Sequence, residues 1–202
     1  MKSHSILLVA ALAVAGCAAA PYTLVPVERQ VVGGGLSIEP GSAWNRVNHV
    51  FYEGKLDVWT LDGMTLNSLM IFHGVADGEP ILKPRWVLAG SADKEEKPPV
   101  FRNTMTPLEI QELFEDTLAR IYRTPIVEAR HLKPATLAGE GAFRFETRVV
   151  GRDEVERQGT AVGAVRGGKL YLLWFQGAKL HYYDRYLPEF ERIVASARFV
   201  AR

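Results

Sequence analysis

The chain has 202 residues, with 24 lysines and arginines against 23 aspartates and glutamates, and it contains one cysteine. This length suits one domain with a sizeable core. The nearly balanced charge argues against a nucleic-acid-binding protein, which needs a basic surface, and a single cysteine excludes an internal disulfide bond.

The N-terminus has the pattern of a secretory signal peptide. A single basic residue, Lys2, precedes an uncharged apolar run from Ile6 to Val14. This run of about nine residues is too short to span a bilayer, which needs roughly 20, but it fits the apolar region of a signal peptide. The sequence therefore predicts a signal peptide at residues 1–16, and its removal leaves equal numbers of basic and acidic residues.

Small residues lead up to the cysteine in Val14-Ala15-Gly16-Cys17. This segment resembles the lipobox of bacterial lipoproteins, in which the chain is cut before the cysteine and the thiol takes a diacylglycerol. The resemblance implies that Cys17 is lipidated, that acyl chains such as palmitate anchor the protein in a lipid bilayer, and that the protein faces the periplasm. Ala18 is not the aspartate associated with inner-membrane retention, which favours the outer membrane. The alternative is an ordinary signal peptide, cleaved near residues 18–20.

A spacer and a first group of strands follow. Residues 17–26 are small, contain proline and carry no charge, which is typical of a spacer, and residues 27–202 are predicted to form a single α+β domain. The triple glycine at residues 33–35 predicts a turn, because it lacks the long strand and the helix of a dinucleotide-binding loop. Strands are predicted at residues 36–38, 55–61 and 66–75, the last two being partners in a hairpin.

A charged, proline-rich segment at residues 90–99 predicts an exposed loop, and a helix follows it. The helix is predicted to start at Pro107, since Thr106 can cap it and Glu109 can reach back to the cap. Apolar residues then recur at helical spacing to about Tyr122; they are Ile110, Leu113, Phe114, Leu118 and Ile121.

The last part of the domain is predicted to be a meander of strands and a C-terminal helix at residues 187–197. One strand alternates apolar and polar residues from Phe143 to Val149, which predicts one buried and one wet face. The stretch from Leu170 to Phe175 is apolar on both faces, which predicts a central strand covered on both sides. The predicted strands are residues 126–132, 141–150, 156–165 and 169–176.

Two segments resemble a known family. Leu36-Ser-Ile-Glu-Pro40 before Trp44 resembles the opening of the PsbP and Mog fold family, and the segment from Phe190 to Phe199 resembles its closing helix. The resemblance implies an α-β-α sandwich, in which a mainly antiparallel sheet is covered by the amphipathic helix and the C-terminal helix. Members of the family are mostly accessory or binding proteins without shared catalytic residues, so no catalytic residue is implied here.

The sequence predicts no metal site, no cofactor and no catalytic residues. The histidines of the mature chain lie far apart, without the spacing that places two metal ligands on one element. Cys17 is the only thiol, and the chain has no Gly-x-Ser-x-Gly motif. A hydrolase site built from dispersed residues stays open as an alternative. The histidines concerned are His49, His73, His131 and His181.

Two clusters are candidate binding surfaces. Tyrosine and arginine are favoured at binding hot spots, and the segment before the last helix is rich in them, although closing the core beneath the helix is the favoured role for these rings. The second cluster is a row of arginines on the wet strand face, where interleaved acidic residues favour an ordinary solvated surface over an anion site. The residues are His181, Tyr182, Tyr183, Arg185 and Tyr186 in the first cluster, and Arg144, Arg148 and Arg152 in the second.

These observations favour a non-catalytic lipoprotein of the cell envelope that binds or supports another envelope protein. The alternative functions are a carrier of a small apolar ligand, which requires an enclosed apolar cavity, and the dispersed-site hydrolase. They differ in what they require of the fold, since an interaction module needs a filled core and an exposed surface patch.

Overall fold

A computed structural model describes residues 20–48, 52–84 and 97–200. The signal peptide, the lipidation of Cys17 and most of the loop predicted at residues 90–99 lie outside these residues. No helix in the described part of the chain is long and apolar enough to cross a membrane.

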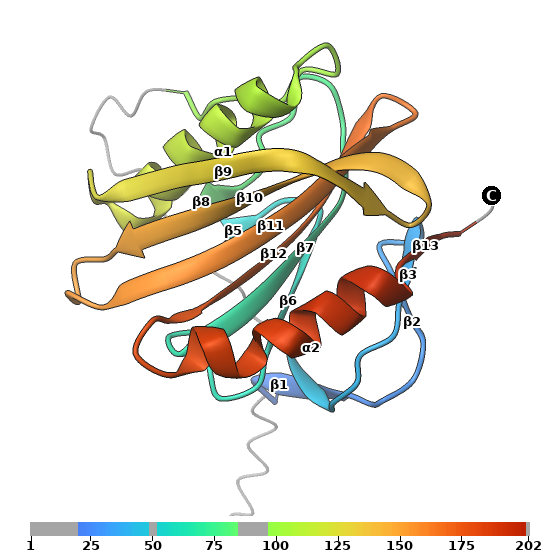
Figure 1. Cartoon of the computed structure of the whole chain (residues 1–202), viewed down its shortest axis with the longest axis vertical. Helices are drawn as coiled ribbons and strands as arrows, with labels where there is room; N and C mark the ends of the chain where they lie inside the picture. Colours follow the sequence, from blue (N-terminus) through green and yellow to red (C-terminus); the bar gives the residue numbers. More distant parts are fainter. Residues whose placement is uncertain (1–19, 49–51, 85–96, 201–202) are drawn as a thin grey trace, which may run out of the picture.

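The centre of the fold is an antiparallel sheet of eight strands (Figure 1). Its order is β1-β4-β6-β7-β12-β11-β10-β9, so β1 and β9 form its two edges. Two smaller sheets have the orders β13-β3-β2 and β5-β8. The strands are β1 (Tyr22–Val25), β2 (Gln30–Val32), β3 (Leu36–Ile38), β4 (Trp44–Val47), β5 (Tyr52–Glu53), β6 (Leu56–Thr60), β7 (Asn67–Val75), β8 (Lys83–Pro84), β9 (Val127–Leu137), β10 (Glu140–Val150), β11 (Glu156–Arg166), β12 (Lys169–Ala178) and β13 (Arg198–Phe199).

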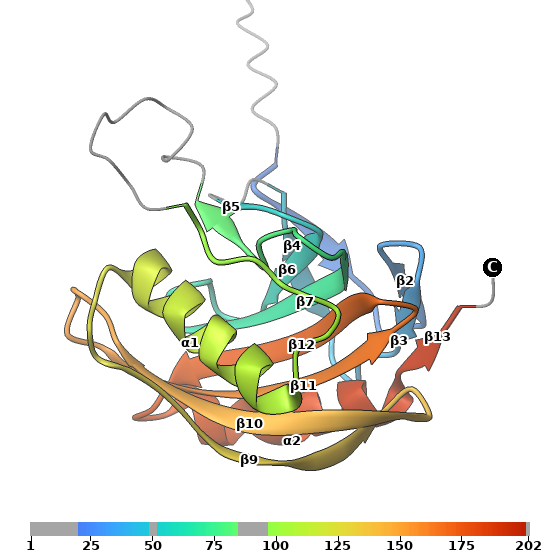
Figure 2. The same cartoon turned by 90° about the horizontal axis from the view of Figure 1, so that it is seen from above.

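Helix α1 (Pro107–Tyr122) covers one face of this sheet, and α2 (Tyr182–Ser196) covers the other (Figures 1 and 2). Each face has its own hydrophobic cluster. Phe114 of α1 packs on Trp174 on one side, and Phe190 of α2 packs on Phe175 on the other. The predicted α-β-α sandwich with a mainly antiparallel sheet is therefore confirmed.

The predicted start of α1 and the predicted central strand are also confirmed. Thr106 accepts a hydrogen bond from the backbone N–H of Glu109 (3.3 Å), and the Glu109 carboxylate accepts one from the N–H of Thr106 (2.6 Å). Strand β12 lies inside the sheet, and every residue from Leu170 to Phe175 is buried.

Strand β9 runs to Leu137, past its predicted end at Leu132. Its register against β10 shifts beside His131, which has a φ of 59°, and this bulge absorbs an extra residue. Pro134 does not end the strand, because β9 lies at the sheet edge and a missing N–H on the outer side breaks no ladder hydrogen bond.

The segment predicted as a spacer, residues 17–26, contains strand β1, which pairs with β4. Just before it, the carbonyl oxygens of Ala20 and Pro21 accept hydrogen bonds from Asn48 at 2.7 and 3.0 Å. Val25, at the end of the strand, is buried. The uncharged residues that suggest a spacer are therefore the first edge of the sheet.

Helix α2 starts at Tyr182, upstream of its predicted range, residues 187–197. Pro188 suggests a helix start, because proline is tolerated in the first turn, yet it lies inside the helix. Packing extends the helix upstream: Tyr183 is buried and stacks on Phe175, with ring centroids 6.1 Å apart.

Candidate functional site

A groove runs between helix α1 and the edge strand β9. Its volume is about 520 Å³. Three carboxylates and a glutamine line its helix side, and small or apolar residues line its strand side. We call it the α1–β9 groove; its walls include Leu108, Gln111, Glu112, Glu115 and Asp116 of α1, and Val127 and Ala129 of β9.

A second hollow, of about 400 Å³, adjoins this groove at the N-terminal end of α1. Leu108 lines both hollows and is 52% exposed. Apart from Thr106 and Lys133, the walls are apolar. We call it the apolar pocket; its other lining residues are Pro107, Leu108, Leu132, Pro134, Ala142 and Phe143.

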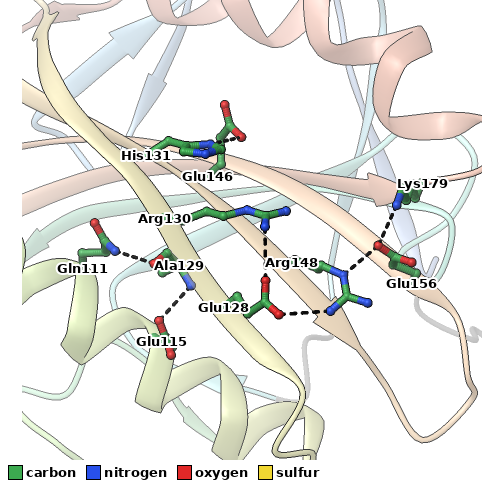
Figure 3. Close-up of polar contacts among 10 residues, drawn as sticks. All are labelled: Gln111, Glu115, Glu128, Ala129, Arg130, His131, Glu146, Arg148, Glu156 and Lys179. Carbon is green, nitrogen blue, oxygen red and sulfur yellow. Dashed lines mark hydrogen bonds and ion pairs between the residues drawn. The ribbon is translucent and has the colours of Figure 1, made fainter.

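Two side chains of α1 bind the outer edge of β9 at a single residue (Figure 3). Gln111 Nε2 donates to the carbonyl oxygen of Ala129 (2.6 Å), and the N–H of Ala129 donates to Glu115 Oε2 (2.8 Å). The two side chains occupy the place of a neighbouring strand at this residue. They therefore protect an edge that otherwise invites pairing with another chain, and they hold the groove at a fixed width.

Gln111 spans the groove, and only the nitrogen of its side-chain amide forms a hydrogen bond with the described residues. The residue is 7% exposed, and its Oε1 has no hydrogen-bond partner among the described residues. Figure 3 shows this oxygen turned away from Ala129, to which the amide nitrogen is bound. A buried acceptor without a donor costs about 1–3 kcal/mol, so the groove wall contains a residue whose hydrogen bonding is incomplete.

Replacing Glu115 by alanine is expected to lower the free energy of unfolding by about 1–2 kcal/mol, because the N–H of Ala129 loses its acceptor. Urea unfolding followed by circular dichroism measures the change. Glu115→Gln keeps an oxygen acceptor and is expected to cost less.

The matched control is Glu112→Ala, which makes the same chemical change one turn away on an exposed residue. It is expected to stay within about 0.5 kcal/mol of the unchanged protein. Equal losses in Glu115→Ala and Glu112→Ala would show that the bond to β9 contributes nothing to stability.

The opposite side of β9 carries a chain of alternating charges that crosses three strands (Figure 3). Glu128 pairs with Arg130 (3.4 Å) and with Arg148 (3.3 Å), and Arg148 also pairs with Glu156 (2.8 Å). Hydrogen bonds from Arg148 and Lys179 hold the pKa of the Glu156 carboxyl below its usual range. Each positive charge here has a carboxylate neighbour.

The other two arginines of the predicted row are also bound within the fold. Arg144 forms two hydrogen bonds with the carboxylate of Glu191 on α2, and Arg152 donates to the carbonyl oxygen of Arg123 (3.3 Å). The arginine row is thus a set of ion pairs and loop contacts, which gives no support to an anion site.

The predicted aromatic cluster lies in the first turns of α2, and the structure divides it. Tyr183 points into the core and shares a hydrogen bond with Thr160 (2.8 Å), and burial raises the pKa of its hydroxyl. The other members lie at least partly in solvent. Among them, His181 packs edge-on against Tyr182 at 5.1 Å, and the Arg185 guanidinium lies 5.1 Å from the ring of Tyr186.

The described histidines contact different neighbours. His73 lies 3.6 Å from Asp57, His131 lies 2.9 Å from Glu146, and His181 contacts Arg185, whereas His49 is outside the described residues. In the described ranges, no three histidine, cysteine, aspartate or glutamate side chains come together in a way that suits a metal ion.

The sequence does not predict the groove or the pocket, because their lining residues are distant in the chain and come together only in the folded domain. Gln111 is the clearest missed residue. Its only signal in the sequence is a neutral amide beside the apolar stripe of α1, where a charged residue would be expected on the solvent side.

Comparison with known proteins supports the fold. No family model matches the chain, and no curated protein matches it in sequence. The solution structure of cyanobacterial PsbP (CyanoP) from Synechocystis sp. PCC 6803 is similar, with a TM-score of 0.56 and 16% identity over 92% of this chain and 96% of that chain. The chain therefore has a PsbP-like fold, as the resemblance implied.

A second, weaker likeness is to LpqN of Mycobacterium tuberculosis, described as involved in cell envelope biogenesis. The identity is 10%, over 91% of this chain and 88% of that chain, and the TM-score is 0.34. A likeness at this level does not bear on the fold or function of the chain.

Proposed function

We propose that this chain is a cell-envelope lipoprotein whose PsbP-like domain is a non-catalytic binding module. The observation that carries the proposal is the α1–β9 groove, an open surface hollow with an apolar pocket at one end, on a domain whose sheet is packed on both faces. Such a hollow suits a segment of another protein, whereas a carrier of apolar ligands encloses its ligand within the core.

The proposed anchor is Cys17, with acyl chains in the outer membrane and the domain in the periplasm. The domain lies close to it in the chain, because Ala20 and Pro21 are already hydrogen-bonded to Asn48. An extended chain spans at most about 3.6 Å per residue, so Ala20 lies within roughly 11 Å of an anchor at Cys17. The domain is then held against the membrane, with the β1 edge of the sheet nearest to it.

Replacing Cys17 by serine tests this proposal. Because acyl chains on this thiol are the proposed attachment, the variant is expected to leave the membrane fraction, whereas the unchanged protein requires detergent for extraction. Cell fractionation and mass spectrometry of the mature N-terminus measure both effects.

The matched control is Ala18→Asp, which keeps the thiol and is expected to stay in the membrane fraction, with altered sorting between the two membranes. An unmodified N-terminal residue, or a Cys17→Ser variant that still requires detergent, would contradict the anchor.

A further inference from the structure

We propose that the α1–β9 groove binds a basic, extended peptide segment of a partner protein, with one apolar side chain in the apolar pocket. This inference rests on the proposed function as a binding module and names the chemistry of its partner. Three observations support it: the negative charge of the groove, the Oε1 acceptor of Gln111 and the length of the groove.

The charge of the groove is negative. Glu112, Glu115 and Asp116 line it, and no lysine, arginine or histidine is among its lining residues. Glu112 is exposed and has no ion pair or hydrogen bond to its side chain among the described residues, so it is free to pair with a cation from a partner. Asp116 contacts Arg120 at 3.2 Å, but this exposed pair is weak and easily exchanged.

Gln111 adds a requirement for a hydrogen-bond donor. Gln111 lines the groove, and its Oε1 has no hydrogen-bond partner within residues 20–48, 52–84 and 97–200. Arginine, lysine and the backbone N–H are all donors, so a basic peptide supplies both the positive charge and the missing donor. An acidic or purely apolar segment supplies neither.

The dimensions fit a short extended chain. The groove follows α1 from Leu108 to Ala119, which is about 16 Å at 1.5 Å per residue, and about five extended residues cover this length. Glu112 and Asp116 are about 6 Å apart along the helix axis. Alternate residues of an extended chain are about 6.6 Å apart, so two basic side chains at alternate positions can face both carboxylates.

The apolar pocket determines what lies beside the basic residues. Its volume of about 400 Å³ accommodates a large side chain, and Leu108, half exposed, forms the boundary between pocket and groove. Lys133 also lines the pocket. For a peptide that runs parallel to α1, the expected motif is therefore an apolar residue followed by basic residues at alternate positions.

Two other occupants are disfavoured by the same charges. In a symmetric dimer the same patch meets itself, so the carboxylates of two grooves would repel each other. An anionic lipid surface would be repelled as well. A basic segment of a different protein remains the occupant that matches the charge.

Fluorescence anisotropy with the full mature protein in detergent tests the inference. The probe is a six-residue labelled peptide with one leucine followed by alternating arginine and serine, and the control peptide carries glutamate in place of arginine. The arginine peptide is expected to bind, with an affinity that falls as salt is added, and the glutamate peptide is not. Absence of binding by the arginine peptide would overturn the inference.

Matched variants locate the binding. Glu112→Lys is expected to lower the affinity for the arginine peptide at least about tenfold, which corresponds to the loss of one favourable charge contact. Glu28→Lys makes the same charge change on an exposed residue outside the groove and is expected to have less than about a twofold effect. If both variants weaken peptide binding equally, the peptide is attracted by the net charge of the protein alone, and the groove is not its binding site.

A photocrosslinker at position 108 in intact cells separates this inference from the proposed function. Crosslinks to a basic segment of one envelope protein support both. Crosslinks to an acidic or neutral segment overturn the basic-peptide inference and leave the binding module standing. Crosslinks confined to a second copy or to this chain itself overturn the inference. The groove then no longer supports the proposed function as a binding module.

Discussion

Replacing Phe114 by alanine is expected to lower the free energy of unfolding by about 3–5 kcal/mol, because a fully buried ring leaves a cavity that its neighbours fill only in part. Phe114 is one of the residues by which α1 packs on the sheet. Its ring lies 5.2 Å from Trp174, 5.7 Å from Phe145 and 6.1 Å from Phe72, each in an edge-on arrangement. The loss includes these ring contacts as well as buried area.

Guanidinium unfolding of Phe114→Ala and Phe114→Leu measures the effect. Leucine fills more of the space and is expected to lose distinctly less stability than alanine. Leu108→Ala, on the exposed side of the same helix, is expected to cost less than about 1 kcal/mol. A loss below about 1.5 kcal/mol in Phe114→Ala would mean that α1 is held to the sheet by other contacts.

The sequence predicts those parts of the fold whose signals are local. The cap at Thr106, the apolar repeat of α1 and the alternation from Phe143 to Val149 each fall within one element, and the structure confirms them. The same holds for the all-apolar stretch from Leu170 to Phe175, which lies inside the sheet. In each case a short stretch determines both the element and its buried face.

The parts that the sequence did not predict depend on contacts between distant residues. Strand β9 continues past Pro134 because it is an edge strand, and only the finished sheet shows which strand is at the edge. Helix α2 begins at Tyr182 because the ring of Tyr183 stacks on Phe175 of the sheet. Position in the chain alone gives no sign of either contact.

The candidate site shows the same limit. The predicted aromatic cluster rests on residue type alone, and one of its members, Tyr183, is a core residue that bonds to Thr160. The groove depends on how α1 lies against β9, where Gln111 and Glu115 bind the backbone of Ala129. Charged and polar residues on a helix are usually solvated, so nothing in the sequence distinguishes Gln111 and Glu115 from an ordinary exposed face.

Glu189 joins the two segments that suggested the fold family. It lies in α2, beside Phe190, yet it is only 6% exposed. Its Oε1 accepts hydrogen bonds from the backbone N–H groups of Gly41 (2.6 Å) and Ser42 (2.9 Å), in the turn that leads to Trp44. A side chain at position 41 would place its Cβ 2.7 Å from Glu189 Oε2, so the Glu189 carboxylate would have to shift to admit it.

Replacing Glu189 by alanine is therefore expected to lower the free energy of unfolding by about 2–4 kcal/mol, because two backbone donors lose a charged acceptor at once. Glu189→Gln keeps one oxygen for both donors and is expected to retain most of the stability. Urea unfolding compares the variants, and hydrogen exchange at Gly41 and Ser42 reports the turn directly. Exchange there is expected to rise in Glu189→Ala before the sheet unfolds, since both amides then lose their acceptor on α2. Unchanged exchange at both amides, together with unchanged stability, would show that the two hydrogen bonds to Glu189 do not hold the opening segment against the closing helix.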